Sequence, residues 1–157
     1  MNILIVGSGG REHALAWALA RSPRRPRIFG LPGNPGVAET GTALPGNPLD
    51  TGQVLAAARG HRIDLVVVGS EMPRVAGLAD ALAAAGVRVF GPSAKAAALE
   101  GSKIFAKDLM LRHGIPTAGF EIVTKVERAR EMIKQIAYPH VIKADGLAAG
   151  KGVVIAA

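Results

Sequence analysis

Short, wholly apolar segments alternate with helix-forming segments over the first hundred residues, and this alternation is the strongest constraint on the fold. The predicted strands cover residues 3–6, 27–31, 63–68 and 87–90. The predicted helices between them cover residues 11–21, 50–59 and 73–85. Strands that are apolar on both sides are typical of a parallel sheet with helices on both faces. The sequence therefore predicts an α/β fold with a doubly wound parallel sheet.

Turn and cap residues mark the ends of these elements. Asp50 is a typical cap for the second helix, Pro73 opens the third helix, and Gly86 ends it. The turn at residues 32–36, Pro-Gly-Asn-Pro-Gly, follows the second strand.

The pattern changes near residue 100. Further helices are predicted over residues 95–99, 103–112 and 126–136, and further strands over residues 120–123, 138–142 and 153–157. We place a domain boundary between Pro92 and Gly101, which divides the chain into residues 1–100 and 101–157.

Composition narrows the classes of partner. The chain has 157 residues, 49% of them hydrophobic, a net charge of +7 and no cysteine. The charge favours anionic partners, but the only dense basic run, residues 21–27, holds two prolines that prevent a groove-binding helix. Aromatic residues, at 4%, are too few for base-stacking platforms. We expect no nucleic acid partner.

The N-terminus leads directly into a short strand. Its apolar run is too short for a signal peptide or a membrane span. A cytoplasmic protein without a membrane partner is the expectation.

Residues 143–153, Lys-Ala-Asp-Gly-Leu-Ala-Ala-Gly-Lys-Gly-Val, carry the clearest chemical signal. A glycine-rich loop lies between two apolar runs, with Lys143 before it and Lys151 near its end. Glycines let backbone N–H groups approach an anion, and lysines neutralise its charge. Val153 follows the loop where a P-loop would require a Ser or Thr and a helix. The pattern predicts a β-hairpin over nucleotide phosphates, in a nucleotide-binding domain that is incomplete at residue 157.

A second glycine-rich turn, residues 7–10, follows the first strand. It resembles the start of a dinucleotide fingerprint, but Glu12 stands where the third glycine should be and would oppose a pyrophosphate. No acidic residue follows before Glu39 to meet a ribose hydroxyl. The turn is therefore either a plain tight turn or, with Arg11, a site for one phosphate or another substrate group.

The carboxyl ends of parallel strands share one edge of a sheet, where ligands bind in open α/β folds. The topology predicts that Gly9, Gly10, Asn34 and Glu71 gather there. Asn34 could bond sugar hydroxyls, and Glu71 could accept from hydroxyls or an amine. Lys103 begins a helix after a Ser102 cap. A cation at this end interacts unfavourably with the helix dipole, which costs a little stability, and an anionic ligand could offset this cost.

Four motifs together resemble the phosphoribosylamine–glycine ligases, also called glycinamide ribonucleotide synthetases, of the ATP-grasp superfamily. They are Gly-Ser-Gly-Gly-Arg-Glu-His-Ala at 7–14, Pro-Gly-Asn-Pro-Gly at 32–36, Glu-Gly-Ser-Lys at 100–103 and the loop at 143–153. The resemblance covers essentially the whole chain. It implies an N-terminal domain like that of biotin carboxylase, followed by the start of an ATP-grasp domain.

The resemblance also implies a reaction and its sites. ATP would phosphorylate the carboxylate of glycine, and 5-phosphoribosylamine would attack the glycyl phosphate, giving glycinamide ribonucleotide in purine biosynthesis. The residues implied on the ATP side are Lys103, Lys143, Gly150, Lys151 and Gly152. The residues implied on the phosphoribosylamine side are Gly9, Gly10, Arg11, Asn34, Gly36 and Glu71.

Two departures from the family pattern qualify this expectation. In a turn that is usually Gly-Pro-Glu-x-Pro-Leu, this chain has Ser70 in place of the first Pro and Arg74 in place of the Leu. We expect these two residues to loosen the turn and to change its charge. The family's chain continues past residue 157, so the Mg²⁺ ligands are expected there and no metal or catalytic residue is assigned here. The 157 residues alone are expected to be inactive and to self-associate through an exposed strand edge.

Two other functions stay open. One is a second purine-pathway ATP-grasp enzyme that uses formate or carbonate, and the other is a non-catalytic module that binds a phosphoribosyl ligand.

Overall fold

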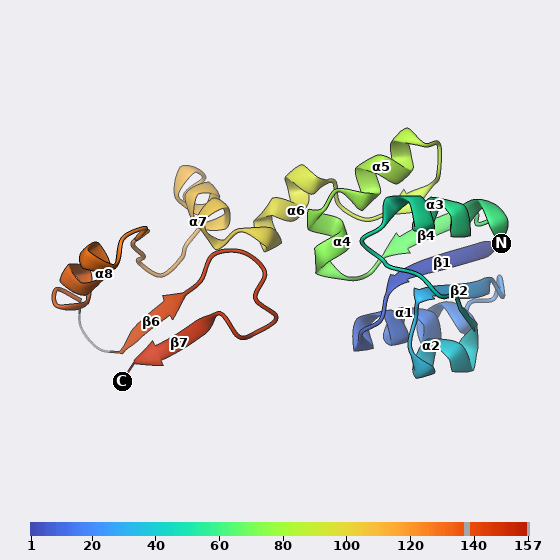
Figure 1. Cartoon of the computed structure of the whole chain (residues 1–157), viewed down its shortest axis with the longest axis horizontal. Coiled ribbons are helices and arrows are strands. Elements are labelled where there is room, and N and C mark those ends of the chain that lie inside the picture. The colour runs from blue at the N-terminus through green and yellow to red at the C-terminus, as the bar shows by residue number, and fades with distance from the viewer. Residues whose placement is uncertain (137–138, 157) are drawn as a thin grey trace. The chain divides into compact units, whose positions relative to one another are not determined.

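The structure is a computed structural model that describes residues 1–136 and 139–156 (Figure 1). The chain divides into two compact units, Met1–Ala97 and Ala98–Ala157, and each is described by itself. The start of the predicted strand at Tyr138 and the end of the last one at Ala157 lie outside the described residues.

The first unit is built on a parallel sheet of five strands in the order β3-β2-β1-β4-β5. The strands are β1 (Asn2–Gly7), β2 (Arg27–Pro32), β3 (Thr42–Ala43), β4 (Leu65–Val68) and β5 (Val89–Phe90). The helices are α1 (Gly10–Ala20), α2 (Pro35–Thr40), α3 (Thr51–Gly60), α4 (Glu71–Val75) and α5 (Leu78–Ala84), and helix α6 (Ala94–Gly101) begins in this unit and ends in the second. The strand order reverses between β1 and β4, so their carboxyl ends border the crevice where open α/β sheets bind ligands.

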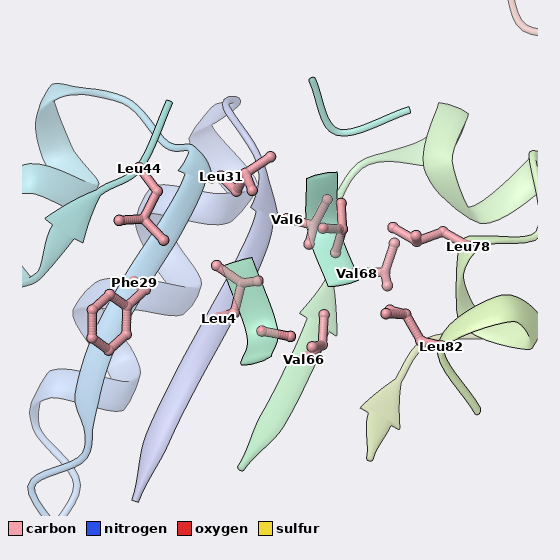
Figure 2. Close-up of a cluster of buried hydrophobic side chains, with 11 residues drawn as sticks. Leu4, Val6, Phe29, Leu31, Leu44, Val66, Val68, Leu78 and Leu82 are labelled. Carbon is pink, nitrogen blue, oxygen red and sulfur yellow. The ribbon is translucent and has the colours of Figure 1, made fainter. Parts of the chain in front are cut away.

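Both faces of this sheet are buried. Alternate residues of β1 point to opposite faces, and each set belongs to its own buried cluster. Leu4 and Val6 belong to a cluster completed by residues of α3 and α5 (Figure 2). Ile3 and Ile5 belong to a second cluster completed by residues of α1 and α2. The prediction of a doubly wound parallel sheet is confirmed.

Side-chain caps fix where several helices begin. Asp50 Oδ1 accepts a hydrogen bond from the N–H of Gln53 at 3.0 Å, so the predicted cap of α3 is confirmed. Asn34 caps α2, a helix that the sequence analysis missed and treated as part of a turn. Pro35 occupies the first helical position, where its missing N–H costs nothing.

Two local predictions were wrong and one strand was missed. The helix predicted over residues 73–85 is two helices, because Gly77 between α4 and α5 is left-handed with φ of 82°. The two-residue strand β3 was missed, since it is too short to show an alternating pattern. The strand predicted over residues 120–123 is absent, because that segment has no hydrogen-bonded strand partner in the described part of the chain.

The second unit holds helix α7 (Lys103–Arg112), helix α8 (Val126–Ile133) and the strands β6 (His140–Lys143) and β7 (Val153–Ala156). The two strands form the predicted antiparallel hairpin, with Lys143 opposite Val153. Apolar side chains of the hairpin stay exposed, including Val154 at 61% and Ile155 at 67%. No helix within the described residues is long and apolar enough to cross a membrane.

Candidate functional site

Hydrogen bonds of the Asn34 side chain join the turns after β1 and β2 at the carboxyl edge of the sheet. The side-chain amide of Asn34 donates to the carbonyls of Ser8 and Gly9 at 3.0 and 2.9 Å. Its Oδ1 accepts from the N–H of Val37 at 2.9 Å, in the cap of α2. The structure thus brings Gly9 and Asn34 together as predicted, and the amide of Asn34 is engaged with the backbone. Its contact with sugar hydroxyls stays a prediction.

Arg11 joins the turn after β1 to the turn after β4. One guanidinium nitrogen donates to the carbonyl of Gly69 at 2.9 Å, and another lies 2.7 Å from Oε1 of Glu71. The pKa of Glu71 is held below 4.5, first by its backbone N–H and then by the hydrogen bond from Arg11. Both side chains stay substantially exposed, at 50% and 38%, so this pair remains accessible to a ligand.

Arg74 also binds the turn after β4. Its guanidinium donates to the carbonyl of Gly69 at 2.6 Å and to that of Ser70 at 3.2 Å. The expectation that Arg74 loosens this turn was therefore wrong. Because Arg11 and Arg74 both converge on Gly69, two cations flank the carboxylate of Glu71. Their guanidinium groups are hydrogen-bond donors of the kind that bind an anionic ligand.

Glu12 lies between the same two turns, and its side chain is only 2% exposed. Oε2 accepts from the N–H of Gly9 at 2.5 Å. A Cβ built at Gly69 would lie 2.2 Å from Oε1, and one built at Gly7 would lie 2.8 Å from the carboxyl carbon. The carboxylate therefore accepts an N–H of the turn that a dinucleotide-binding turn would offer to a pyrophosphate. This placement explains why the fingerprint is interrupted at Glu12.

The remaining residues predicted on this edge differ in their surroundings. Gly10 is exposed, and a Cβ built there would meet nothing within 4 Å, so its backbone is open to solvent. Gly36 lies against the ring of His13, where an added Cβ would come within 2.4 Å of the imidazole. Gly36 therefore serves packing in this structure, and its predicted contact with substrate is untested.

Two shallow hollows in the first unit lie at the opposite edge, near the amino ends of the strands. One is bordered by residues 26–29 and 38–42, and the other by residues 58–64 and 86–88. Neither contains a residue of the predicted site. Among the described residues, no group of three or more His, Cys, Asp or Glu side chains is placed to hold a metal ion.

In the second unit, the carboxylate of Asp145 lies at the first turn of α7. Its Oδ1 accepts from the N–H groups of Lys103 at 2.7 Å and Ile104 at 3.2 Å. The hydroxyl of Ser102 lies 3.1 Å from Oδ2 and also accepts from the N–H of Phe105. The N–H of Ile104 is the main cause that lowers the pKa of Asp145 below 3.8. A carboxylate of the chain itself thus lies at the start of α7, and the binding of an anionic ligand by Lys103 stays a prediction.

The side chain of Lys103 binds the same segment. Its ammonium donates to the carbonyl of Gly146 at 2.8 Å. Lys143 ends strand β6 and is exposed, two residues before Asp145. The structure thus connects Lys103 to the start of the glycine loop, as a shared site for the two lysines would require.

The loop between β6 and β7 continues the hairpin for one step beyond the strands. The N–H of Ala144 donates to the carbonyl of Gly152 at 2.8 Å. Gly146 and Gly150 are left-handed, with φ of 84° and 77°, which explains the glycines at both positions. The described loop has the predicted form, with exposed Lys151 beside Gly150 on its second arm.

Sequence reasoning missed Arg74 and Asp145 as site residues. Arg74 was read only as a departure from a pattern. Asp145 could have been found from two signals, an acidic residue inside the lysine loop and a helix without acidic residues in its first turn.

Family comparisons cover the whole chain. Residues 1–100 match the family described as phosphoribosylglycinamide synthetase, N domain. Residues 101–157 match the family described as phosphoribosylglycinamide synthetase, ATP-grasp (A) domain.

Individual proteins give the same result. The chain is 53% identical over 156 residues to the phosphoribosylamine–glycine ligase of Rhizobium meliloti (strain 1021), covering 99% of this chain and 37% of that relative. It resembles the crystal structure of the phosphoribosylamine–glycine ligase of Thermotoga maritima, with a TM-score of 0.76, 38% identity, and coverage of 99% and 36%.

Biotin carboxylase of Campylobacter jejuni shares the fold alone. The TM-score is 0.75 at 19% identity, and the match covers 99% of this chain and 38% of that one. This likeness confirms the predicted architecture. The chain thus spans well under half the length of each of these relatives.

Proposed function

Because the chain belongs to the phosphoribosylglycinamide synthetase family, we propose that the protein is an ATP-dependent ligase that joins glycine to 5-phosphoribosylamine. The γ-phosphoryl group of ATP passes to the carboxylate of glycine, giving glycyl phosphate and ADP. The amine of phosphoribosylamine then attacks the carbonyl carbon. The C–O bond to phosphate breaks, and glycinamide ribonucleotide, phosphate and a proton leave.

The glycine loop with its lysines is the observation that carries this proposal. Transfer of a phosphoryl group needs fixed positive charge around oxygens that are already negative, and it needs water to be excluded. Lys103 and Lys143 supply that charge from one side. Gly150, Lys151 and Gly152 belong to the second arm of the loop, where Gly150 and Lys151 are exposed, and we expect this arm to cover the phosphates.

The carboxyl edge of the first unit is proposed to hold phosphoribosylamine. Arg11 and Arg74 bring two guanidinium groups to this edge as donors for the substrate phosphate, next to the open backbone of Gly10. Glu71 would accept a hydrogen bond from a sugar hydroxyl or from the amine. Gly9, Asn34 and Gly36 shape the turns around this place.

Mg²⁺ is the second cofactor expected for such a reaction, since it neutralises ATP and orients its phosphates. Among the described residues, no cluster of three or more His, Cys, Asp or Glu side chains could hold this ion. The 157 residues cover 37% of the Rhizobium meliloti relative. We expect that these residues alone do not catalyse the reaction.

The test is ADP formation by the intact protein with ATP, Mg²⁺, freshly generated phosphoribosylamine and one carboxylate at a time. We expect ADP formation with glycine and only background with formate or bicarbonate. ADP formation with formate or bicarbonate instead would favour the other purine-pathway enzymes. Binding of ribose 5-phosphate without any ATP cleavage would favour a non-catalytic module.

Self-association is a separate proposal, because the exposed apolar side chains of β6 and β7 offer a surface to a second copy. Sedimentation of the 157-residue chain should show a dimer or larger species whose fraction rises with concentration. Val154→Lys should reduce that fraction. A monomer at every concentration would contradict the proposal.

A further inference from the structure

Asp145 has no assigned role in the proposed reaction, yet it makes more hydrogen bonds than any lysine of the loop. It accepts from the backbone N–H groups of Lys103 and Ile104 and from the hydroxyl of Ser102. The residues on the two sides of this contact are 41 to 43 positions apart in the sequence. The contact therefore fastens the glycine loop to α7.

The start of α7 needs such an acceptor. The first N–H groups of a helix have no partner within the helix, and α7 has no acidic residue in its first turn. The hydroxyl of Ser102 takes the N–H of Phe105, and Asp145 takes those of Lys103 and Ile104. These three amides are thereby occupied. A phosphate near α7 would have to be bound by side chains.

The same contact fixes one arm of the loop and leaves the other open. Asp145 and Gly146 hold the backbone and the ammonium of Lys103, respectively. On the other arm, a Cβ at Gly150 would meet nothing within 4 Å, and Lys151 beside it is exposed. The loop thus consists of a fixed arm that follows Lys143 and a free arm around Gly150 and Lys151, which rejoins the hairpin where the carbonyl of Gly152 accepts the N–H of Ala144.

We propose that Asp145 is a positioning residue of the nucleotide site. Its hydrogen bonds attach the fixed arm of the glycine loop to α7, and they thereby hold Lys103 beside the end of strand β6, which carries Lys143. The free arm is then the part that closes over the phosphates. This inference rests on the proposed function. It predicts that Asp145 acts on the binding of ATP and not on that of glycine.

The test compares the intact protein with Asp145→Ala, Asp145→Asn and Asp108→Asn. Asp108→Asn is the matched control, since it removes an exposed carboxylate from the same helix. Misplacing the lysines in Asp145→Ala should lower kcat/KM for ATP between about 10- and 100-fold, with the KM for glycine unchanged. Asp145→Asn keeps an acceptor at Oδ1, so it should recover part of this loss. The control should match the wild type.

Amide hydrogen exchange and ATP titration separate this inference from the proposed function. Asp145→Ala should speed exchange at Lys103 and Ile104 and weaken ATP binding, even if the wild type shows no glycine-dependent activity. Unchanged exchange, or an equal loss for ATP and glycine, would overturn the positioning role. If Asp145→Ala does not fold, Ser102→Ala and Asp145→Asn carry the same comparison, and wild-type values in both would overturn it.

Discussion

At the scale of single residues, the chain places its own carboxylates where the sequence predicted or excluded a bound anion. Glu12 lies at the start of α1, and Asp145 lies at the start of α7. A carboxylate near a helix N-terminus accepts N–H groups and interacts favourably with the helix dipole. The two helix ends are thereby stabilised without ligand.

Glu12→Ala should lower the free energy of unfolding by about 0.5–2 kcal/mol, because it removes the carboxylate that accepts the N–H of Gly9 and caps the start of α1. Urea denaturation followed by circular dichroism measures the change. Glu39→Ala on α2 is the control, because Glu39 is exposed, and its effect should stay within about 0.5 kcal/mol. Equal effects of the two substitutions would contradict the structural role of Glu12.

The pH dependence of stability should reveal Glu71. Its pKa is lowered from 4.5 in the folded chain, so its interactions stabilise the fold above pH 4.5 and are lost as the pH falls through the lower folded pKa. The difference in unfolding free energy between the wild type and Glu71→Gln should be constant above pH 4.5 and should shrink below it. A difference that grows on acidification would contradict the lowered pKa.

At the scale of elements, the sequence predicted what hydrophobic runs and side-chain caps determine. The central strands β1, β2 and β4 were found because each is an apolar run, and α3 and α7 because Asp50 and Ser102 cap them. Short elements were missed, since α2 and β3 depend on neighbours that a local pattern does not contain. The strand predicted over 120–123 failed for the same reason, because pairing decides a strand.

The break between α4 and α5 gives a test at this scale. Gly77 is left-handed, and a Cβ there would meet Ala94 at an ordinary 3.6 Å, so strain comes only from the backbone. Gly77→Ala should therefore lower the free energy of unfolding by about 1–2 kcal/mol. Gly60→Ala at the end of α3, where a Cβ meets nothing, is the control and should be neutral or stabilising. Equal destabilisation by both substitutions would show that the backbone at Gly77 is not the cause.

At the scale of the whole molecule, the order of the strands and the loop motif predicted the two candidate sites. The topology brought Gly9 and Asn34 to one edge and placed Arg11 beside Glu71, and the hairpin formed around the glycine loop. The contacts of Arg74 with Gly69 and Ser70 could not be predicted, because they depend on side-chain direction, which no spacing rule encodes. Asp145 was missed, although the sequence offered the two signals named above. The family membership links the two sites into one proposed reaction.

The transfer of oxygen from glycine to phosphate is the measurement that tests this account most directly. The intact protein would be incubated with ATP, Mg²⁺, phosphoribosylamine and glycine labelled with ¹⁸O in its carboxylate, and the released phosphate analysed by mass spectrometry. A glycyl phosphate intermediate places one ¹⁸O atom in each phosphate, because the oxygen that attacks ATP leaves with the phosphoryl group. Unlabelled phosphate, or phosphate released equally without glycine, would contradict the proposed ligase.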